Sequence, residues 1–236
     1  MTNLQSILPE DKPQTPILEP HNFFLFGAPM AGKSYFASFF PHPLSLNTDG
    51  NAEQSSTPAI QIRNTFNADG SLKQNAISQL SEIILALNQP NVTFKTVIVD
   101  VIDDICVMME QAICKQYGAQ CLADIPYGKG YALLNGTLQE FVLELKALQM
   151  NTIFVSRELD KTDEKTARTS YVPSLKTKYY DVVTGNCDAV IHFSKIGDEY
   201  IRQVTQKRAA YKKDDVKDER VRKLLSSCTG MFTNEK

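Results

Sequence analysis

The chain has 236 residues and a formal net charge of −2; 42% of its residues are hydrophobic and 22% are charged. This length suits one α/β domain with short appendages, and the hydrophobic content is enough for a full core. The balanced charge excludes a general attraction to nucleic acid or membranes, so binding of a polyanion would need a local basic patch. There is no signal-peptide pattern and no apolar run of the ~18–20 residues that a membrane helix needs, so we expect a cytoplasmic protein with no membrane partner.

The first part of the chain predicts a tail followed by a strand, a loop, a helix and a second strand. Residues 1–20 hold four prolines among polar residues and are expected to form a flexible tail. Residues 23–26 are wholly apolar, as in a strand buried on both faces of a parallel sheet. Residues 33–40 can form a helix, and residues 43–47 a second strand.

The middle and end of the chain continue the alternation of helices and strands. Residues 51–71 are polar and are expected to be irregular, whereas apolar residues at helical spacing predict a helix over about 72–88. The further expected elements are a strand at 96–100, a helix at 102–117, a loop containing 127–131, a helix at about 134–148, a strand at 152–156, a loop at 158–180, strands at 189–193 and 200–204, and a short helix at 217–226. This order predicts the α/β class, with a mostly parallel central sheet and helices on both faces. We expect one domain over 21–210 and a charged C-terminal segment over 211–236.

The most specific motif is Gly27-Ala28-Pro29-Met30-Ala31-Gly32-Lys33-Ser34, which matches the G-x-x-x-x-G-K-[ST] pattern of a phosphate-binding loop. A chain of this length matches the pattern by chance in only about 1% of cases. The two glycines let backbone N–H groups point at phosphate oxygens. Lys33 would neutralise the outer phosphates during catalysis, and Ser34 would bind Mg²⁺. The motif therefore predicts ATP and Mg²⁺ as ligands; the alternative is a glycine-rich turn with an exposed lysine.

A second ligand for the magnesium ion is expected at the end of the strand at 96–100. Asp100 ends this apolar strand, as the aspartate of a Walker B motif does. Asp103 and Asp104 are alternatives, although carboxylates at the start of a helix also serve as caps.

Hydrolysis also needs a group that orients the attacking water. Val101, directly after Asp100, cannot do this, so the candidate general base is Asp49, which follows the strand at 43–47. The alternative for Asp49 is a turn-forming Asp-Gly pair. Ser156 or Arg157, at the end of the strand at 152–156, would contact the γ-phosphate, unless they are ordinary polar residues at a strand end.

These motifs together resemble a known group of proteins. Leu46-Asn47-Thr48-Asp49, Val97-Ile98-Val99-Asp100 without a following Glu, and Phe154-Val155-Ser156-Arg157 occur in an order that is similar to the RecA-like ATPase core. The short chain and Tyr127-Gly128-Lys129-Gly130-Tyr131 resemble the phage P-loop nucleotide-binding proteins, also described as phage-type AAA ATPases related to single-strand annealing recombinases. The resemblance covers roughly residues 22–210.

The resemblance implies a RecA-like fold, ATP with Mg²⁺, and a homo-oligomer that acts on single-stranded DNA in phage recombination or replication. It places the protein in the host-cell cytoplasm if it is phage-encoded, with a phage single-strand-binding protein as a candidate partner. Two residues depart from the pattern. Asp49 stands where relatives carry Glu, which would slow hydrolysis, and Asn47 stands where Asp is common.

In RecA-like proteins two loops face the DNA, and here they correspond to about 118–131 and 158–180. Cations and tyrosines are interleaved in the second loop, a pattern that suits phosphates and stacked bases. These residues are Lys161, Lys165, Arg168, Lys176 and Lys178 with Tyr171, Tyr179 and Tyr180. The alternatives are a solvated connector for this loop and a flexible hinge for 127–131.

The leading hypothesis is therefore an ATPase that acts on single-stranded DNA. The competing hypotheses are a nucleotide-switched binding or loader protein with negligible hydrolysis and a small-molecule kinase.

Overall fold

The computed structural model describes residues 9–16, 18–50, 56–162 and 169–233. Its centre is a seven-stranded sheet with the order β11-β10-β1-β7-β6-β2-β3. These strands are β1 (Asn22–Gly27), β2 (Pro43–Asn47), β3 (Ala59–Gln61), β6 (Thr96–Asp100), β7 (Asn151–Ser156), β10 (Ala189–Ile196) and β11 (Glu199–Lys207). Every neighbouring pair is parallel except β10–β11. The carboxyl ends of β1, β2, β6 and β7 therefore meet at one edge of the sheet, where ligands of such sheets bind.

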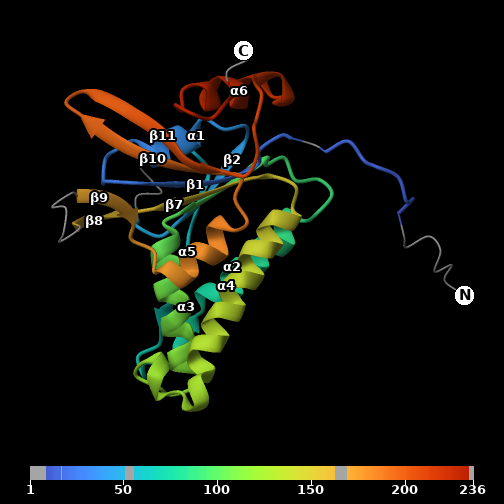
Figure 1. The fold of residues 1–236 in the computed structure, drawn as a ribbon. Coiled ribbons are helices and arrows are strands. Elements are labelled where there is room, and N and C mark those ends of the chain that lie inside the picture. Colours follow the sequence, from blue (N-terminus) through green and yellow to red (C-terminus); the bar gives the residue numbers. More distant parts are fainter. Residues whose placement is uncertain (1–8, 17, 51–55, 163–168, 234–236) are drawn as a thin grey trace, which may run out of the picture.

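Helices cover both faces of this sheet (Figure 1). On one face lie α1 (Lys33–Ser38) and α6 (Glu219–Ser226); on the other lie α2 (Ala76–Leu87), α3 (Ile102–Gln116), α4 (Lys129–Ala147) and α5 (Thr177–Thr184). The predicted fold class, α/β with a mostly parallel central sheet and helices on both faces, is confirmed.

Strand β1 contributes side chains to two hydrophobic cores, one on each face of the sheet. Phe24 and Phe26 belong to the core cluster shared with α2–α5, whereas Phe23 and Leu25 belong to the cluster shared with α1 and α6. All four side chains are at most 4% exposed. Side chains of a strand alternate between the two faces, so a wholly apolar run indicates a strand that is covered on both.

The segment after residue 210 packs onto the α1 face of the sheet. Tyr211, Val216, Val221 and Leu225 are buried in the same cluster as Phe36 of α1. Asp218 caps α6, because its carboxylate accepts hydrogen bonds from the backbone N–H groups of residues 220 and 221. The C-terminal segment thus forms part of the folded body, although its sequence is strongly charged.

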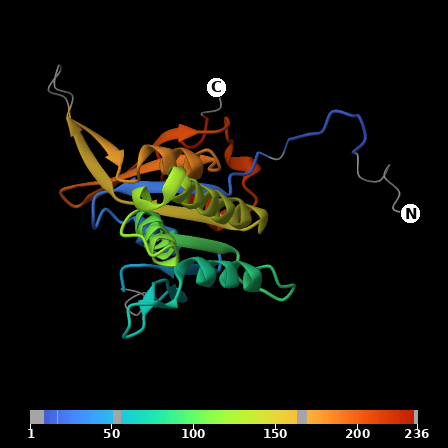
Figure 2. The ribbon, with the colours of Figure 1, turned by 90° about the horizontal axis from the view of Figure 1, so that it is seen from below.

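Several short elements lie where the sequence predicted irregular structure. They are β4 (Thr65–Phe66), β8 (Glu158–Thr162), β9 (Thr169–Pro173) and the 3-10 helices Leu122–Asp124, Pro126–Gly128 and Lys213–Asp215, in addition to β3. The start of the helix predicted over about 72–88 is wrong, because β5 (Leu72–Gln74) occupies it and α2 begins at Ala76. Strands of two to five residues are too short to show a clear hydrophobic period. The prediction of a loop over 158–180 is wrong, because β8 and β9 form an antiparallel hairpin that projects from the body (Figure 2) and α5 follows it.

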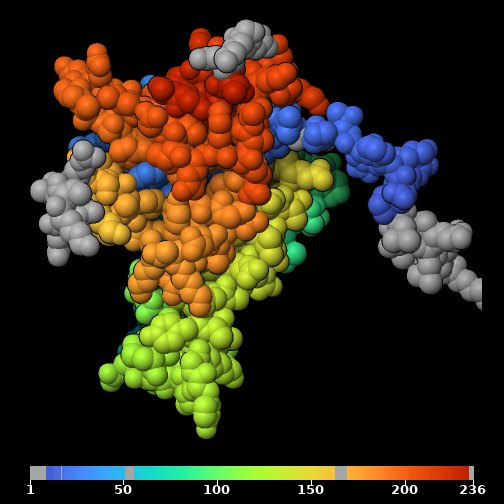
Figure 3. All heavy atoms as spheres, viewed as in Figure 1, coloured from blue at the N-terminus to red at the C-terminus, as the bar shows by residue number. Residues whose placement is uncertain are grey.

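The helices α3 and α4 extend beyond the sheet as an arm (Figures 1 and 3). The chain between them turns tightly, and α4 begins at Lys129, earlier than predicted. A Cβ atom at Gly130 would lie 2.5 Å from the carbonyl oxygen of Leu122, so this close approach requires glycine. Tyr127 sits in the turn with a positive φ of 60° and a fully exposed side chain. The predicted loop at 127–131 is thus a short 3-10 turn that leads into α4. Among the described residues, no helix is both long and apolar enough to span a membrane.

Candidate nucleotide-binding site

The phosphate-binding motif lies between the end of β1 and the start of α1, as the sequence predicted. A Cβ atom at Gly27 would lie 2.1 Å from the carbonyl oxygen of Phe193 on β10, so no side chain fits there. Gly32 has a φ of 85° and precedes α1, in the left-handed region that glycine adopts without strain. Both glycines of the motif are thus required by the shape of the loop.

Lys33 points back into the loop. Its Nζ donates hydrogen bonds to the carbonyl oxygens of Gly27, at 2.7 Å, and Ala28, at 2.8 Å, and the residue is 9% exposed. Burial lowers the pKa of Lys33, and the nearby carboxylates of Asp100 and Glu158 partly oppose this shift. A phosphate in the loop would give this ammonium a charged partner in place of two neutral carbonyls.

Asp100 lies beside the loop at the end of β6. It is 7% exposed, and the nearby hydroxyl of Ser34 favours the charged form of its carboxylate. Burial raises the pKa of Asp100, and the neighbouring charge of Asp49 raises it further. A hydroxyl and a carboxylate side by side at the loop are the oxygen ligands that Mg²⁺ prefers, so these residues fit the predicted ion.

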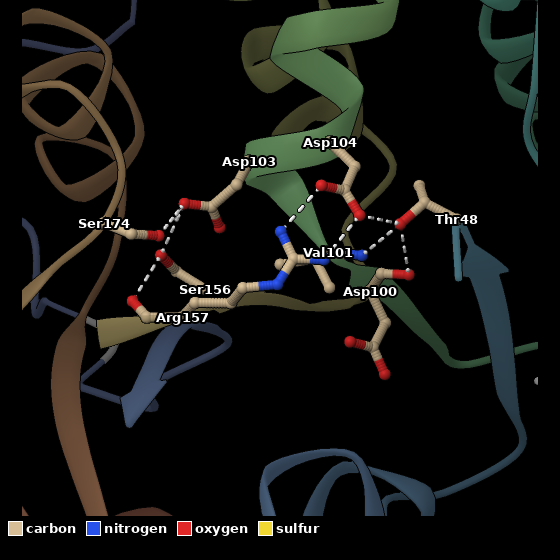
Figure 4. Close-up of polar contacts among 8 residues, drawn as sticks. All are labelled: Thr48, Asp100, Val101, Asp103, Asp104, Ser156, Arg157 and Ser174. Atoms are coloured by element: carbon tan, nitrogen blue, oxygen red, sulfur yellow. Dashed lines mark hydrogen bonds and ion pairs between the residues drawn. The ribbon is translucent and has the colours of Figure 1, made fainter. Parts of the chain in front are cut away.

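Asp103 and Asp104, the alternatives for the metal ligand, face away from the loop (Figure 4). Asp103 accepts hydrogen bonds from the hydroxyls of Ser156 and Ser174. Figure 4 shows the carboxylate of Asp100 pointing to the opposite side of this network. The geometry therefore favours Asp100 over both alternatives as the magnesium ligand.

Arg157, Asp104 and Thr48 link the ends of three strands (Figure 4). The guanidinium of Arg157 donates to both carboxylate oxygens of Asp104, at 2.7 and 2.8 Å. The hydroxyl of Thr48, just after β2, donates to Asp104 Oδ2 at 3.0 Å and accepts from the backbone N–H of Val101 at 3.0 Å. Thr48 was missed in the sequence, where its only signal is its position next to Asp49.

The structure separates the two candidates for contact with the γ-phosphate. Ser156 is fully buried, and its hydroxyl donates to Asp103 Oδ1 at 3.2 Å. Arg157 is partly exposed, and its charge acts on both Lys33 and Asp100. Arg157 is thus the better placed of the two to meet a phosphate.

A hollow of about 660 Å³ opens next to Ser34 and Asp100. Asp49 lines it together with Asn47, Tyr35 and other residues of α1, β2 and the following turn. Asp49 is exposed and acts electrostatically on Asp100 and Arg157. The structure thus brings the candidate general base to the same side of the loop as the candidate magnesium ligands.

Of the three tyrosines that the DNA hypothesis invoked in 158–180, only Tyr171 is exposed, at 53%, whereas Tyr179 and Tyr180 face the sheet. Tyr179 is 7% exposed in the core, and the ring of Tyr180 meets Phe24 edge-on with centroids 5.5 Å apart. The expectation that these rings stack on bases is wrong, because α5 turns them toward the sheet. Lys161, Lys176 and Lys178 are exposed, whereas Lys165 and Arg168 lie outside the described residues.

Glu158 and His192 form a further pair that the sequence did not reveal. His192 Nε2 lies 2.7 Å from Glu158 Oε2, and the imidazole stacks between Phe26 of β1 and Tyr171 of β9. Glu158 and His192 are 34 positions apart in the chain and on different strands, so no local pattern could indicate their contact. The pair joins the base of the β8–β9 hairpin to β10, which lies next to the strand that precedes the phosphate-binding loop.

Comparison with known proteins identifies the family of the chain. The family model described as an AAA domain matches residues 19–217, which is most of the chain and includes β1, the phosphate-binding loop, β6 and β7. No curated protein matches the sequence. Because the family match spans well over half of the chain, the protein belongs to the AAA domain family of P-loop nucleotide-binding ATPases.

Proposed function

We propose that this protein hydrolyses ATP with Mg²⁺ and acts on single-stranded DNA as a homo-oligomer, in phage recombination or replication. The observation that carries the catalytic part is that Ser34, Asp100 and Asp49 line one hollow beside the loop. In this proposal the N–H groups of residues 27–34 hold the phosphates and Lys33 neutralises the β- and γ-phosphates. Ser34 and Asp100 hold the magnesium ion, which supplies charge stabilisation when bound.

Asp49 would orient the attacking water. Its carboxylate is one methylene shorter than that of glutamate, so we expect slow turnover. Arg157 would exchange its partner Asp104 for the γ-phosphate, because a phosphate and a carboxylate bind the same planar N–H donors of a guanidinium.

Two surfaces support binding of single-stranded DNA. The β8–β9 hairpin follows Arg157 directly and carries the exposed Lys161, and the start of α5 carries the exposed Lys176 and Lys178. The tip of the α3–α4 arm carries the fully exposed ring of Tyr127, the half-exposed ring of Tyr131 and Lys129, whose Nζ lies 5.2 Å from the ring centroid of Tyr117. Cations beside exposed rings suit a polymer with phosphates and unpaired bases.

A nucleotide-switched binding or loader protein is the second candidate, and the Arg157–Asp104 pair favours it. Through Asp104, this pair connects Thr48, next to Asp49, to the start of the β8–β9 hairpin. Release of Arg157 from Asp104 when ATP binds would therefore change the position of that hairpin even without hydrolysis. Phosphate release by the purified protein, with and without single-stranded DNA, separates the candidates. Turnover that DNA stimulates supports the ATPase. Tight ATP binding with no turnover in either condition would favour the switch.

A further inference from the structure

We propose that Tyr200 is the stacking platform for the base of the bound nucleotide, an inference that rests on the proposed function of the loop. Tyr200 lies on β11, outside the predicted motifs. A Cβ atom built on Gly32 would be 3.2 Å from Cδ1 and 3.4 Å from Cε1 of this ring. One edge of the Tyr200 ring therefore borders the backbone of the phosphate-binding loop.

The direction of the triphosphate follows from the sheet order. Ser34, Asp100 and Asp49 lie on the β7-β6-β2 side of β1, and the first two would hold the magnesium ion beside the outer phosphates there. The phosphate chain runs along the loop, so its α-phosphate and the nucleoside leave on the other side of β1. The strands on that side are β10 and β11.

The turn between β10 and β11 places an aromatic ring on the side of β1 where the nucleoside would leave the loop. Lys195 and Tyr200 are directly paired across the two strands, beyond the level at which Phe193 pairs with Gly27. Figure 1 shows the two strands reaching past the end of β1. The β10–β11 hairpin thus extends beyond the edge of the sheet at which the phosphates would bind.

The face of the Tyr200 ring is accessible. The residue is 50% exposed, and the Nζ of the exposed Lys195 lies 5.1 Å from the ring centroid. A lysine side chain is flexible and moves at little cost, so a flat base can take its place on the ring.

The hollow beside Ser34 is the competing place for the base, because the ring of Tyr35 lines it and is 68% exposed. That hollow also contains Asp49 and Asp100, the groups assigned to the water and the metal ion at the γ-phosphate. A base placed there would reverse the phosphate chain and separate the metal ligands from the β- and γ-phosphates.

The test compares binding of Mg-ATP and of inorganic tripolyphosphate by calorimetry, in wild type, Tyr200→Ala, Tyr200→Phe and Tyr35→Ala. Loss of one base stack weakens binding by about 5- to 150-fold. We expect this loss for ATP with Tyr200→Ala, whereas tripolyphosphate binding is unchanged, Tyr200→Phe binds both ligands as wild type does, and Tyr35→Ala changes neither.

Three outcomes would overturn the inference and leave the P-loop assignment intact: unchanged ATP binding by Tyr200→Ala, equal weakening of both ligands by it, or loss of ATP binding by Tyr35→Ala alone. Equal weakening would show that Tyr200 only supports the loop, and the effect of Tyr35→Ala would place the base in the hollow. Failure of the wild type to bind either ligand would instead overturn the proposed function itself.

Discussion

The guanidinium of Arg157 donates hydrogen bonds to both carboxylate oxygens of Asp104, at 2.7 and 2.8 Å, and so connects the end of β7 to the first turn of α3. This pairing lowers the pKa of Asp104, chiefly through the hydrogen bond from Arg157, and raises that of Arg157. Because β8 follows immediately, the pair sits between the nucleotide site and the hairpin.

The first prediction concerns this pair. Arg157→Lys keeps the charge but loses the planar arrangement of donors that grips a carboxylate or a phosphate. We expect ATP turnover to fall about tenfold or more while ATP affinity changes little, because the γ-phosphate contact contributes mainly during the reaction. Steady-state phosphate release and equilibrium ATP binding, measured on the same preparation, check this. Equal losses in both would mean that Arg157 serves only to bind ATP.

Asp100→Asn tests the magnesium ligand, and the raised pKa of Asp100 also predicts the direction in which this substitution changes stability. The folded-state pKa of Asp100 is raised, chiefly by burial, so its charged form is disfavoured by folding and destabilises the protein above the ordinary pKa of the group. We expect Asp100→Asn to raise the melting temperature of the nucleotide-free protein at neutral pH, yet to abolish the further stabilisation by Mg-ATP. Thermal melts with and without Mg-ATP measure both effects. Asp103→Asn is the matched control, and retention of the Mg-ATP effect in Asp100→Asn alone would move the ion to another ligand.

Asp49→Asn should leave ATP binding near the wild-type level and reduce hydrolysis, because an amide cannot accept a proton from the attacking water. Loss of a general base typically costs about 10²–10⁴ in rate. Asp49→Glu should increase turnover if the short side chain limits it. Single-turnover hydrolysis at saturating ATP is the measurement. Unchanged rates in Asp49→Asn would leave Asp49 as a turn residue.

The DNA proposal predicts a specific salt dependence. Replacing Lys176 and Lys178 with glutamine should flatten the dependence of single-stranded DNA affinity on salt by about 1–2 units of slope, since each lysine that contacts a phosphate releases a counterion. Lys212 and Lys213, which are exposed near α6, provide a control pair of the same charge. Fluorescence anisotropy with a labelled oligonucleotide at several salt concentrations measures the slopes. Equal slopes for the two double variants would make the region around β8, β9 and α5 a solvated connector.

The sequence predicted the strands of the central sheet well where their residues were uniformly apolar, as in β1 and β6. It also placed Asp100 and Asp49 near the loop, because the carboxyl ends of parallel strands converge. The β8–β9 hairpin was missed, since its exposed polar residues give no hydrophobic period, and the tyrosines at 179 and 180 were placed on the surface although the helix turns them inward.

The rest of the site depends on contacts between distant segments. Thr48 meets Asp104 across 56 positions, and Arg157 reaches it across 53. The closeness of the Tyr200 ring to Gly32 likewise depends on β10 placing β11 near the end of β1, which no local pattern encodes. These relationships require the assembled sheet.

The central claim is that residues 27–34 form the site of ATP binding and hydrolysis, and Lys33→Ala tests it most directly. Removing this charge-assisted phosphate contact should cost about 1.5–3 kcal/mol, which is roughly tenfold or more in ATP affinity. The measurement is Mg-ATP binding and phosphate release by wild type and Lys33→Ala, side by side, with circular dichroism to confirm folding. We predict weak binding and no turnover in the folded variant. ATP binding and turnover equal to those of the wild type would contradict the account.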